Sequence, residues 1–261
     1  MVRCAFLEWP EGLEPCGAQW ESISREIAAA RPDILVTNEM PFGAWLANDR
    51  KFDADLAKGG IAAHEQGLKA LQELRLPLVI SSRPVWAENK LLNQAFALQA
   101  GRVLPLHCKQ FFPEEAGWYE ASWFRADDGG FVVHDLDGLK VGVLLCTELF
   151  FNERARYYGR AGADLIVAPR ATGLEHHIWE VAGAMAAIVS GGYVVSSNRV
   201  GQTTGSPLFG GKGMAFAPDG HLIAQTSAQT PLVVVELDVE FSRRQKSEYP
   251  CCVSETPHAV L

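Results

Sequence analysis

The sequence contains no long hydrophobic run and no segment typical of a secretory signal. A stretch of about 18 apolar residues is lacking, so no membrane-spanning helix is predicted. The start, MVRCAFLEWPEG, has an early Arg3, but Glu8, Trp9 and Pro10 interrupt its apolar run before it reaches the length of a signal-peptide core. We therefore expect a cytoplasmic protein without a membrane partner.

Cysteine is present, but not in a pattern that predicts a disulfide framework or a metal site. The 6 cysteines are spread over 261 residues, and no CxxC pair or His/Cys cluster has the spacing of zinc ligands. The neighbouring His176 and His177 point their side chains in different directions. Reduced thiols and no bound metal are therefore expected.

A basic stripe is also lacking. The 23 Lys and Arg residues are scattered singly among 31 Asp and Glu residues, which gives a formal net charge of −8. Such a distribution cannot track nucleic-acid phosphates, so a nucleic-acid partner is not expected. The content of 48% hydrophobic and 21% charged residues is that of a globular chain. We expect one domain over residues 1–261, with a polar tail from about residue 242.

Apolar runs of strand length alternate with helical patterns along the chain, in two blocks. The first block has the order β-α-β-α-β and ends in a hairpin that turns at Ala100-Gly101. Two such blocks predict an α/β fold in which two mixed sheets pack face to face with helices outside, a four-layer α-β-β-α sandwich. The predicted helices are 19–30, 62–74, 152–161 and 174–190, and the predicted strands are 2–7, 34–36, 78–81, 94–99, 102–106, 131–135, 139–145, 165–168, 193–198, 213–217 and 232–237.

A cysteine directly follows the predicted strand 139–145 and precedes a helix. The run Val-Gly-Val-Leu-Leu-Cys146-Thr147-Glu148 is typical of the strand-to-turn geometry that exposes a nucleophile. The same pattern suits the last buried residue of a strand, so Cys146 alone leaves both interpretations open.

Two charged residues follow other predicted strands. Glu39 comes just after strand 34–36, at the strand end where α/β sheets bind ligands, and its carboxylate suits a general base. Lys109 follows strand 102–106 and precedes Phe111 and Phe112, so its ammonium suits an oxyanion held in a partly dry pocket. Taken singly, each residue also suits a solvated surface position. The combination of Glu39, Lys109 and Cys146, each after a strand, is what points to a site.

This ordered pattern resembles the nitrilase-like carbon–nitrogen hydrolase superfamily, in its amidase-type branch, over nearly the whole chain. Its members use a Glu-Lys-Cys triad on an α-β-β-α sandwich. Further patches are similar to family motifs in the same order: Arg31-Pro32-Asp33 leading to Glu39, Asn93-Gln94-Ala95, Gly162-Ala163-Asp164 with 167–171, Tyr193-Val194 with 198–201, and Gly213-Met214 with 217–220.

The chain departs from the family pattern close to the triad. Cys146-Thr147-Glu148 replaces the common Cys-Tyr-Asp, and Phe111-Phe112 replaces the usual His-Leu after the lysine. Residues 185–190 replace a helix motif that carries a charged pair. The triad is retained, whereas the resemblance does not identify the substrate.

The resemblance implies a second glutamate after the lysine. Glu120, ahead of a Phe and an Asp-bearing turn, fits this pattern best, and Glu114 and Glu115, which are nearer to Lys109, are the alternatives. All three also suit an acidic, solvated loop.

The implied reaction is hydrolysis of a non-peptide carbon–nitrogen bond through a thioester, most simply in an amide of a small carboxylic acid or an N-carbamoyl compound. Glu39 would act as base on Cys146, Lys109 and the backbone N–H of Thr147 would hold the oxyanion, and Glu120 would fix Lys109. No cofactor is needed, and the resemblance implies a homodimer or larger homo-oligomer. The alternatives are a nitrilase that acts on a small nitrile and a catalytically idle member that serves as a binding module.

Loops around the proposed triad contain candidate substrate contacts. The tryptophans among them equally suit core packing. Arg170, just after a predicted strand, suits a substrate carboxylate, although an internal salt bridge explains it as well. The candidates are Trp118, Trp123, Arg170, His176 and Trp179, with His177 as a further one.

Overall fold

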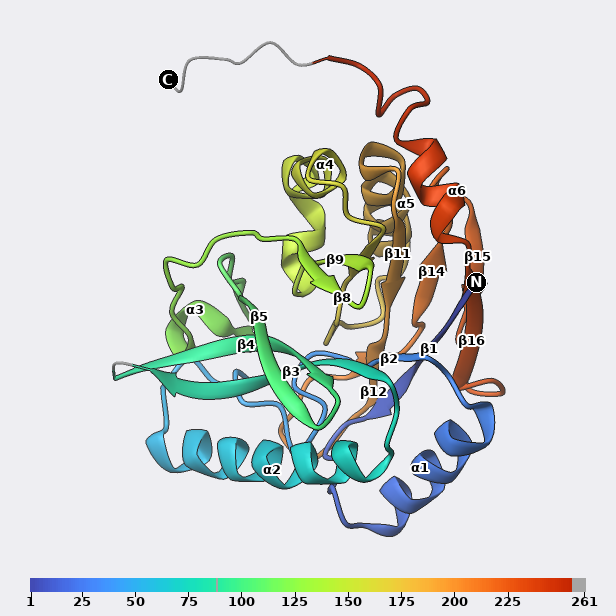
Figure 1. Ribbon diagram of the computed structural model, residues 1–261. Coiled ribbons are helices and arrows are strands. Elements are labelled where there is room, and N and C mark those ends of the chain that lie inside the picture. Colours follow the sequence, from blue (N-terminus) through green and yellow to red (C-terminus); the bar gives the residue numbers. More distant parts are fainter. Residues whose placement is uncertain (88, 255–261) are drawn as a thin grey trace, which may run out of the picture.

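Two mixed β-sheets form the centre of the protein (Figure 1). The computed structural model describes residues 1–87 and 89–254. Parallel strands β1, β2 and β3 lie in the eight-stranded sheet, and β4 and β5 extend it as an antiparallel hairpin. Its order is β13 (Phe209–Gly210), β12 (Asn198–Gly201), β1 (Val2–Pro10), β2 (Ile34–Val36), β3 (Leu78–Ala87), β4 (Lys90–Gln99) and β5 (Arg102–Cys108), with β16 (Leu232–Leu237) also paired to β1.

The second large sheet has six strands. Its three central strands, β9 to β11, are parallel, and antiparallel strands complete both edges. A separate two-stranded hairpin is formed by β6 (Glu114–Glu115) and β7 (Trp118–Tyr119), which follow β5 in the chain. The six-stranded order is β15 (Leu222–Gln225), β14 (Met214–Phe216), β11 (Tyr193–Ser196), β10 (Leu165–Val167), β9 (Leu139–Val143) and β8 (His134–Leu136).

Helices cover the outer face of each sheet (Figure 1). Helices α1 (Ala18–Ala30) and α2 (Ala54–Glu73) bury apolar residues against the eight-stranded sheet, while α4 (Asn152–Arg160) and α5 (His177–Ser190) do so against the six-stranded sheet. The remaining helices are short: α3 (Glu120–Trp123), the 3₁₀ turn η1 (Cys146–Phe150) and α6 (Val239–Gln245). In the described part of the chain, no helix has both the length and the apolar character that crossing a bilayer requires.

The inner faces of the two sheets share one hydrophobic core. Phe6, Val36 and Ile80 of the eight-stranded sheet belong to the same buried cluster as Val143 and Val167 of the six-stranded sheet. These residues alternate with the outward-facing ones along their strands, as the two-residue period of a strand requires. The α-β-β-α sandwich predicted from the sequence is therefore confirmed.

The predicted single strand 193–198 is wrong. Strand β11 ends at Ser196 in one sheet, and β12 begins at Asn198 in the other. Ser197 marks the crossing: its Oγ accepts the backbone N–H of Leu7 at 3.0 Å and donates to the Val36 carbonyl at 2.6 Å. Ser197 thus connects the two sheets close to the end of β2, the strand that precedes Glu39.

The polar tail predicted from about residue 242 also needs correction, because α6 covers Val239–Gln245. The Asp238 side chain caps this helix by accepting the N–H of Glu240 at 3.1 Å. Ser242, at the predicted start of the tail, is buried and donates to the Gly191 carbonyl at 2.9 Å. The helix is therefore attached to the body of the protein by a polar contact that its composition does not reveal.

Candidate active site

Glu39 lies three residues beyond the end of β2 and is completely buried. Its Oε1 atom accepts two hydrogen bonds, from Lys109 Nζ at 2.8 Å and from Asn93 Nδ2 at 2.7 Å. Its Oε2 atom is buried and has no hydrogen-bond partner within the described residues. A carboxylate with one oxygen anchored and the other unpartnered is well arranged to take a proton from a group that enters the site.

Lys109 directly follows β5 and lies between two buried carboxylates. Its Nζ atom lies 2.8 Å from Glu39 Oε1 and 2.6 Å from Glu120 Oε2, and all three side chains have no exposed surface. Burial alone would lower the pKa of Lys109, but the charges of Glu120 and Glu39 outweigh it and raise that pKa well above its usual range. The lysine therefore stays a cation inside the protein.

The structure brings Glu120, rather than Glu114 or Glu115, to Lys109. Glu120 is the first residue of α3, and burial raises its pKa to about 8, although the charge of Lys109 opposes this shift. Glu114 instead pairs with Arg50 near the surface, at 3.1 Å, and Glu115 is exposed.

Cys146 follows β9 by three residues and opens η1 in a left-handed backbone conformation, with φ of 68°. A non-glycine residue rarely adopts this conformation, which is typical of strained turns that present a nucleophile. The side chain is 3% exposed. Burial, and next the charge of Glu39, raise the pKa of the Cys146 thiol far above its usual range, while Lys109 and a backbone hydrogen bond from Ala171 act against this. The resting thiol is therefore protonated, and its attack needs a base.

A buried carboxylate that the sequence reasoning missed ties the cysteine turn to the lysine segment. Glu148 Oε2 accepts the N–H of Leu145 and a hydrogen bond from His107 Nε2, both at 2.8 Å, and its Oε1 accepts the N–H of Gln110 at 2.6 Å. Leu145 precedes Cys146, and Gln110 follows Lys109. The signal in the sequence was the acidic residue two positions after the cysteine, but nothing in the sequence paired it with a histidine 41 positions earlier.

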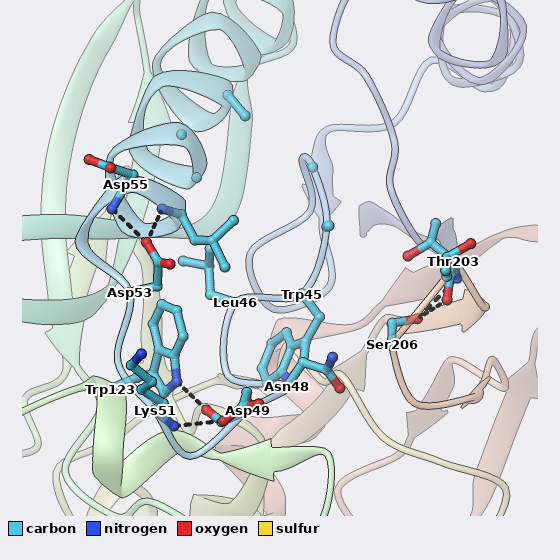
Figure 2. Close-up of a pocket in the computed structure, with 17 residues that line it drawn as sticks. Trp45, Leu46, Asn48, Asp49, Lys51, Asp53, Asp55, Trp123, Thr203 and Ser206 are labelled. Carbon is cyan, nitrogen blue, oxygen red and sulfur yellow. Dashed lines mark hydrogen bonds between the residues drawn. The ribbon is translucent and has the colours of Figure 1, made fainter.

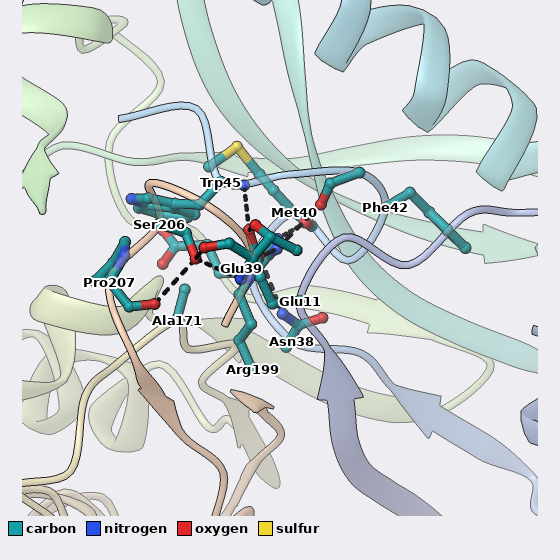
Figure 3. Close-up of polar contacts among 12 residues, drawn as sticks. Glu11, Asn38, Glu39, Met40, Phe42, Trp45, Ala171, Arg199, Ser206 and Pro207 are labelled. Carbon is teal, nitrogen blue, oxygen red and sulfur yellow. Dashed lines mark hydrogen bonds and ion pairs between the residues drawn. The ribbon is translucent and has the colours of Figure 1, made fainter. Parts of the chain in front are cut away.

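A second missed residue, Arg199 of β12, holds the loop that carries Glu39 (Figure 3). Its guanidinium is buried, pairs with Glu11, and donates to the carbonyl groups of Met40 and Gly43. Glu11 in turn accepts the N–H of Trp45 at 3.0 Å. The asparagine-arginine pair at the start of β12 was noted only as a family-like patch, so its contact with the Glu39 loop was not foreseen.

A cavity of about 630 Å³ opens beside Cys146 and Thr147. Trp118 and Trp179 line it, and Trp118 Nε1 donates to the Ala171 carbonyl at 2.7 Å. Thr147 is the second residue of η1, where a backbone N–H has no acceptor inside the helical turn. The nucleophile candidate, a backbone donor and two aromatic side chains thus meet at one cavity.

The other candidate contacts lie elsewhere. Trp123 lines a different cavity, of about 520 Å³, together with Trp45 and Asp53 (Figure 2), and its Nε1 donates to the Asp49 carbonyl at 2.6 Å. His176 occupies the position before α5 without a side-chain capping hydrogen bond and lies outside the lining of the Cys146 cavity. Burial lowers its pKa. His177 is exposed and lines a separate shallow pocket on α4 and α5.

Arg170 is fully buried and is not part of the cavity lining. Its guanidinium donates to Ser196 Oγ at 2.7 Å, to Thr172 Oγ1 at 3.4 Å and to the Lys212 carbonyl at 2.6 Å. It also lies over the Trp179 ring, 5.4 Å from the centroid. The predicted contact with a substrate carboxylate is not supported, because the arginine's donors are engaged inside the protein. The three acceptors are neutral hydroxyl and carbonyl oxygens, so the alternative prediction of an internal salt bridge is not supported either.

The sequence model of one family, described as carbon-nitrogen hydrolase, matches residues 5–246. The chain therefore belongs to the carbon–nitrogen hydrolase family. It is similar to the N-carbamoylputrescine amidase of Arabidopsis thaliana, with 29% identity over 165 residues (56% of this chain and 54% of that protein). It is also similar to a nitrilase of Pyrococcus abyssi, with 31% identity over 128 residues (49% and 48%). The matched part thus spans about half the length of these relatives.

Solved structures share the fold. A carbon-nitrogen hydrolase from Helicobacter pylori G27 is 21% identical, with a TM-score of 0.82 over 96% of this chain and 94% of that one. An amidase from Nesterenkonia sp. is 21% identical, with a TM-score of 0.75 over 93% and 92%. At these identities the likeness establishes the architecture and not the substrate.

Proposed function

We propose that the protein hydrolyses a carbon–nitrogen bond in a small amide or N-carbamoyl compound through a thioester on Cys146. The observation that carries this proposal is the buried Glu39–Lys109–Glu120 cluster, whose charges act on a cysteine thiol that lines a cavity. Such a cluster is costly to bury, so a role that uses its charges explains it better than a structural one. Membership of the carbon–nitrogen hydrolase family supports the same reaction class.

The first half of the reaction forms the thioester. Glu39 takes the thiol proton as the Cys146 sulfur bonds to the substrate carbonyl carbon. The resulting oxyanion is stabilised by the ammonium of Lys109 and the backbone N–H of Thr147. The intermediate then collapses: the carbon–nitrogen bond breaks, Glu39 returns the proton to the leaving nitrogen, and ammonia or an amine departs.

The second half releases the acid. Glu39 takes a proton from a water molecule while the water oxygen bonds to the thioester carbon. The carbon–sulfur bond breaks, and the sulfur recovers the proton from Glu39. Glu120 holds Lys109 in place through its 2.6 Å contact during both halves. The side chains are restored, so the cycle consumes one water and needs no cofactor.

Two relatives add support. The matched Arabidopsis protein is named for an N-carbamoyl amide substrate. In the Nesterenkonia amidase, a glutamate-to-glutamine variant contains the product of Michael addition of acrylamide at the active-site cysteine. A second candidate function, hydrolysis of a small nitrile to its acid and ammonia by the same residues and two waters, is favoured by the match to the Pyrococcus nitrilase.

Ammonia release across a panel of primary amides, N-carbamoyl compounds and nitriles tests the proposal. Wild type and Cys16→Ala, which changes an exposed cysteine, are expected to release ammonia from the same members of the panel. Cys146→Ala is expected to release none. Undiminished turnover by Cys146→Ala contradicts the nucleophile, and no turnover by wild type across the panel favours the idle binding module. Turnover of nitriles alone favours the nitrilase.

A further inference from the structure

The cavity beside Cys146 has an acidic lining. Its charged lining residues, among those that the structure describes, are Glu114, Glu115 and Glu175, and no Lys, Arg or His is among the residues that line it. Glu114 and Glu115 form β6, and Glu175 lies in the loop before α5. Two separate segments of the chain therefore bring negative charge to one cavity.

One of these three carboxylates is neutralised by the protein itself. Glu114 Oε1 pairs with Arg50 Nε at 3.1 Å and accepts a hydrogen bond from Ser122 Oγ at 2.7 Å. Glu115 and Glu175 are exposed, and neither side chain has an ion pair or hydrogen bond with another described residue. These two carboxylates are therefore not offset by a partner among the described residues.

The nearby cations are not placed to offset this charge. Arg170 is buried and engaged by three oxygen acceptors, and it does not line the cavity. Burial, and next the charge of Lys212, lower the pKa of His176, which disfavours its cationic form. Lys212 itself acts on His176 from outside the lining. A substrate carboxylate would therefore meet repulsion at the cavity, whereas a substrate cation would meet attraction.

The rest of the lining suits an alkyl chain. The lining of the same cavity also includes apolar or aromatic surface, from Trp118, Phe150, Leu174, Ile178 and Trp179. Aromatic faces also attract organic cations. A compact acyl amide with a short methylene chain and a terminal ammonium thus matches both the apolar and the acidic parts of the lining.

We infer that Glu115 and Glu175 make the site selective for amides or N-carbamoyl compounds that carry a protonated amine remote from the scissile carbonyl. This inference rests on the proposed function, because it takes Cys146 as the reacting end of the cavity. The glutamates act by attraction across a partly solvated cavity, so the selectivity weakens as salt screens it.

Glu175 also has an alternative role, because a carboxylate just before α5 stabilises the positive end of that helix. Glu115 lies on a two-stranded hairpin and does not directly precede a helix in the chain. A purely structural role of Glu175 would therefore lower the thermal stability of Glu175→Gln without changing substrate preference. Glu115→Gln removes charge from the cavity without affecting the start of α5, so it separates the effect on substrate preference from the effect on stability.

Three amides of matched length test the inference: 5-aminopentanamide, hexanamide and the monoamide of adipic acid. They end in an ammonium, a methyl and a carboxylate group. We expect kcat/KM to fall in that order, with a ratio of about tenfold between the first two, because exposed charges each contribute modestly. In Glu115→Gln/Glu175→Gln the ratio should fall to about twofold or less, as neutral amides cannot replace the two charges.

Glu26→Gln is the matched control, because Glu26 is exposed on α1, remote from the cavity lining. It should keep the wild-type ratio, and raising the ionic strength from about 0.02 to about 0.5 M should lower the ratio in wild type. A wild-type ratio near one, or an unchanged ratio in the double variant, overturns the inference while the proposed function stands.

Binding to Cys146→Ala, measured by calorimetry, keeps the test decisive when none of the three amides is hydrolysed. Tighter binding of 5-aminopentanamide than of hexanamide, lost in the triple variant that adds Glu115→Gln and Glu175→Gln, supports the inference. Equal binding of the two amides overturns it. Selective binding without hydrolysis of any of the three amides counts against the proposed function and leaves the inference about binding in place.

Discussion

The Nζ atom of Lys109 lies 2.6 Å from Oε2 of Glu120, and both side chains are completely buried. The same ammonium contacts Glu39 at 2.8 Å, so one cation faces two carboxylates away from water. Burial, and the charge of Glu39 beyond it, raise the pKa of Glu120 to about 8 even though Lys109 opposes the shift. The Glu120 carboxyl therefore holds its proton to a higher pH than an ordinary glutamate does.

This arrangement predicts a pH-dependent stability. Between the ordinary glutamate pKa of 4.5 and the folded value of about 8, the native state keeps a proton that the unfolded chain has lost. The free energy of unfolding therefore contains a contribution that falls as the pH rises through this window and is fully lost above about pH 8. Urea denaturation of wild type and Glu120→Gln at several pH values between about 5 and 9 measures it. The contribution should vanish in the variant, and parallel pH profiles of the two proteins would contradict the assignment.

Glu39→Gln is expected to separate thiol reactivity from turnover. The charge of Glu39 raises the pKa of Cys146, whereas Lys109 lowers it. Neutralising Glu39 therefore favours the thiolate, and alkylation of Cys146 by iodoacetamide near pH 7 should become about tenfold faster, since the thiolate is the reacting form. Ammonia release should fall by at least about 100-fold, because the proton carrier is lost.

Peptide mapping of the alkylated protein measures the rate at Cys146, with exposed Cys16 as the internal control. The Cys16 rate should be the same in both proteins. Slower alkylation of Cys146 in the variant would mean that Glu39 assists even this reaction, against the electrostatic reasoning.

Glu148 is expected to position the cysteine turn. Its carboxylate accepts hydrogen bonds from the residues next to Cys146 and Lys109, so Glu148→Gln, which has one acceptor oxygen fewer, should shift the two segments apart. A misplacement of about 1 Å costs about 100-fold in rate, so kcat should fall by about that factor with a smaller change in KM. Glu148→Asp restores the charge and should recover part of the loss. A kcat per folded molecule equal to that of wild type would show that Glu148 acts only on stability.

The sequence predicted the layers of the fold because strand-length apolar runs and helical patterns are local signals. It also placed Glu39, Lys109 and Cys146 after strands, and the resemblance selected Glu120. The pairing of Glu148 with His107 was missed because spacing along one chain carries no information on which strand ends meet. The start of α2 was placed at residue 62 instead of Ala54, because Gly59-Gly60 weakens the helical signal that the Asp53 cap restores.

Arg170 illustrates a different limit. An arginine at a strand end is a reasonable carboxylate ligand, and only the structure places Ser196 and the Lys212 carbonyl against its guanidinium. The acidic cavity lining was likewise not foreseen, because Glu115 and Glu175 are 60 positions apart and become neighbours of one cavity only in the fold. The predicted cytoplasmic location and self-association stay predictions.

Arg199→Met should destabilise the protein strongly. Removing the guanidinium leaves Glu11 buried without its ion-pair partner and removes two donors from the loop after Glu39. Breaking a buried pair in this way costs about 3–5 kcal/mol. Urea denaturation should show this loss, and Lys58→Met, at the exposed Lys58–Asp55 ion pair on α2, is the control, with an expected loss below about 1 kcal/mol. A similar small loss for Arg199→Met would mean that the loop is held by other contacts.

The most direct test of the account is intact-protein mass spectrometry of wild type, quenched in acid during turnover of an amide that releases ammonia. The account predicts an added mass equal to the acyl group, located by digestion on the peptide that contains Cys146 and absent from Cys146→Ala. Ammonia release by Cys146→Ala at the wild-type rate, or an acyl group on a different residue during turnover, would contradict it.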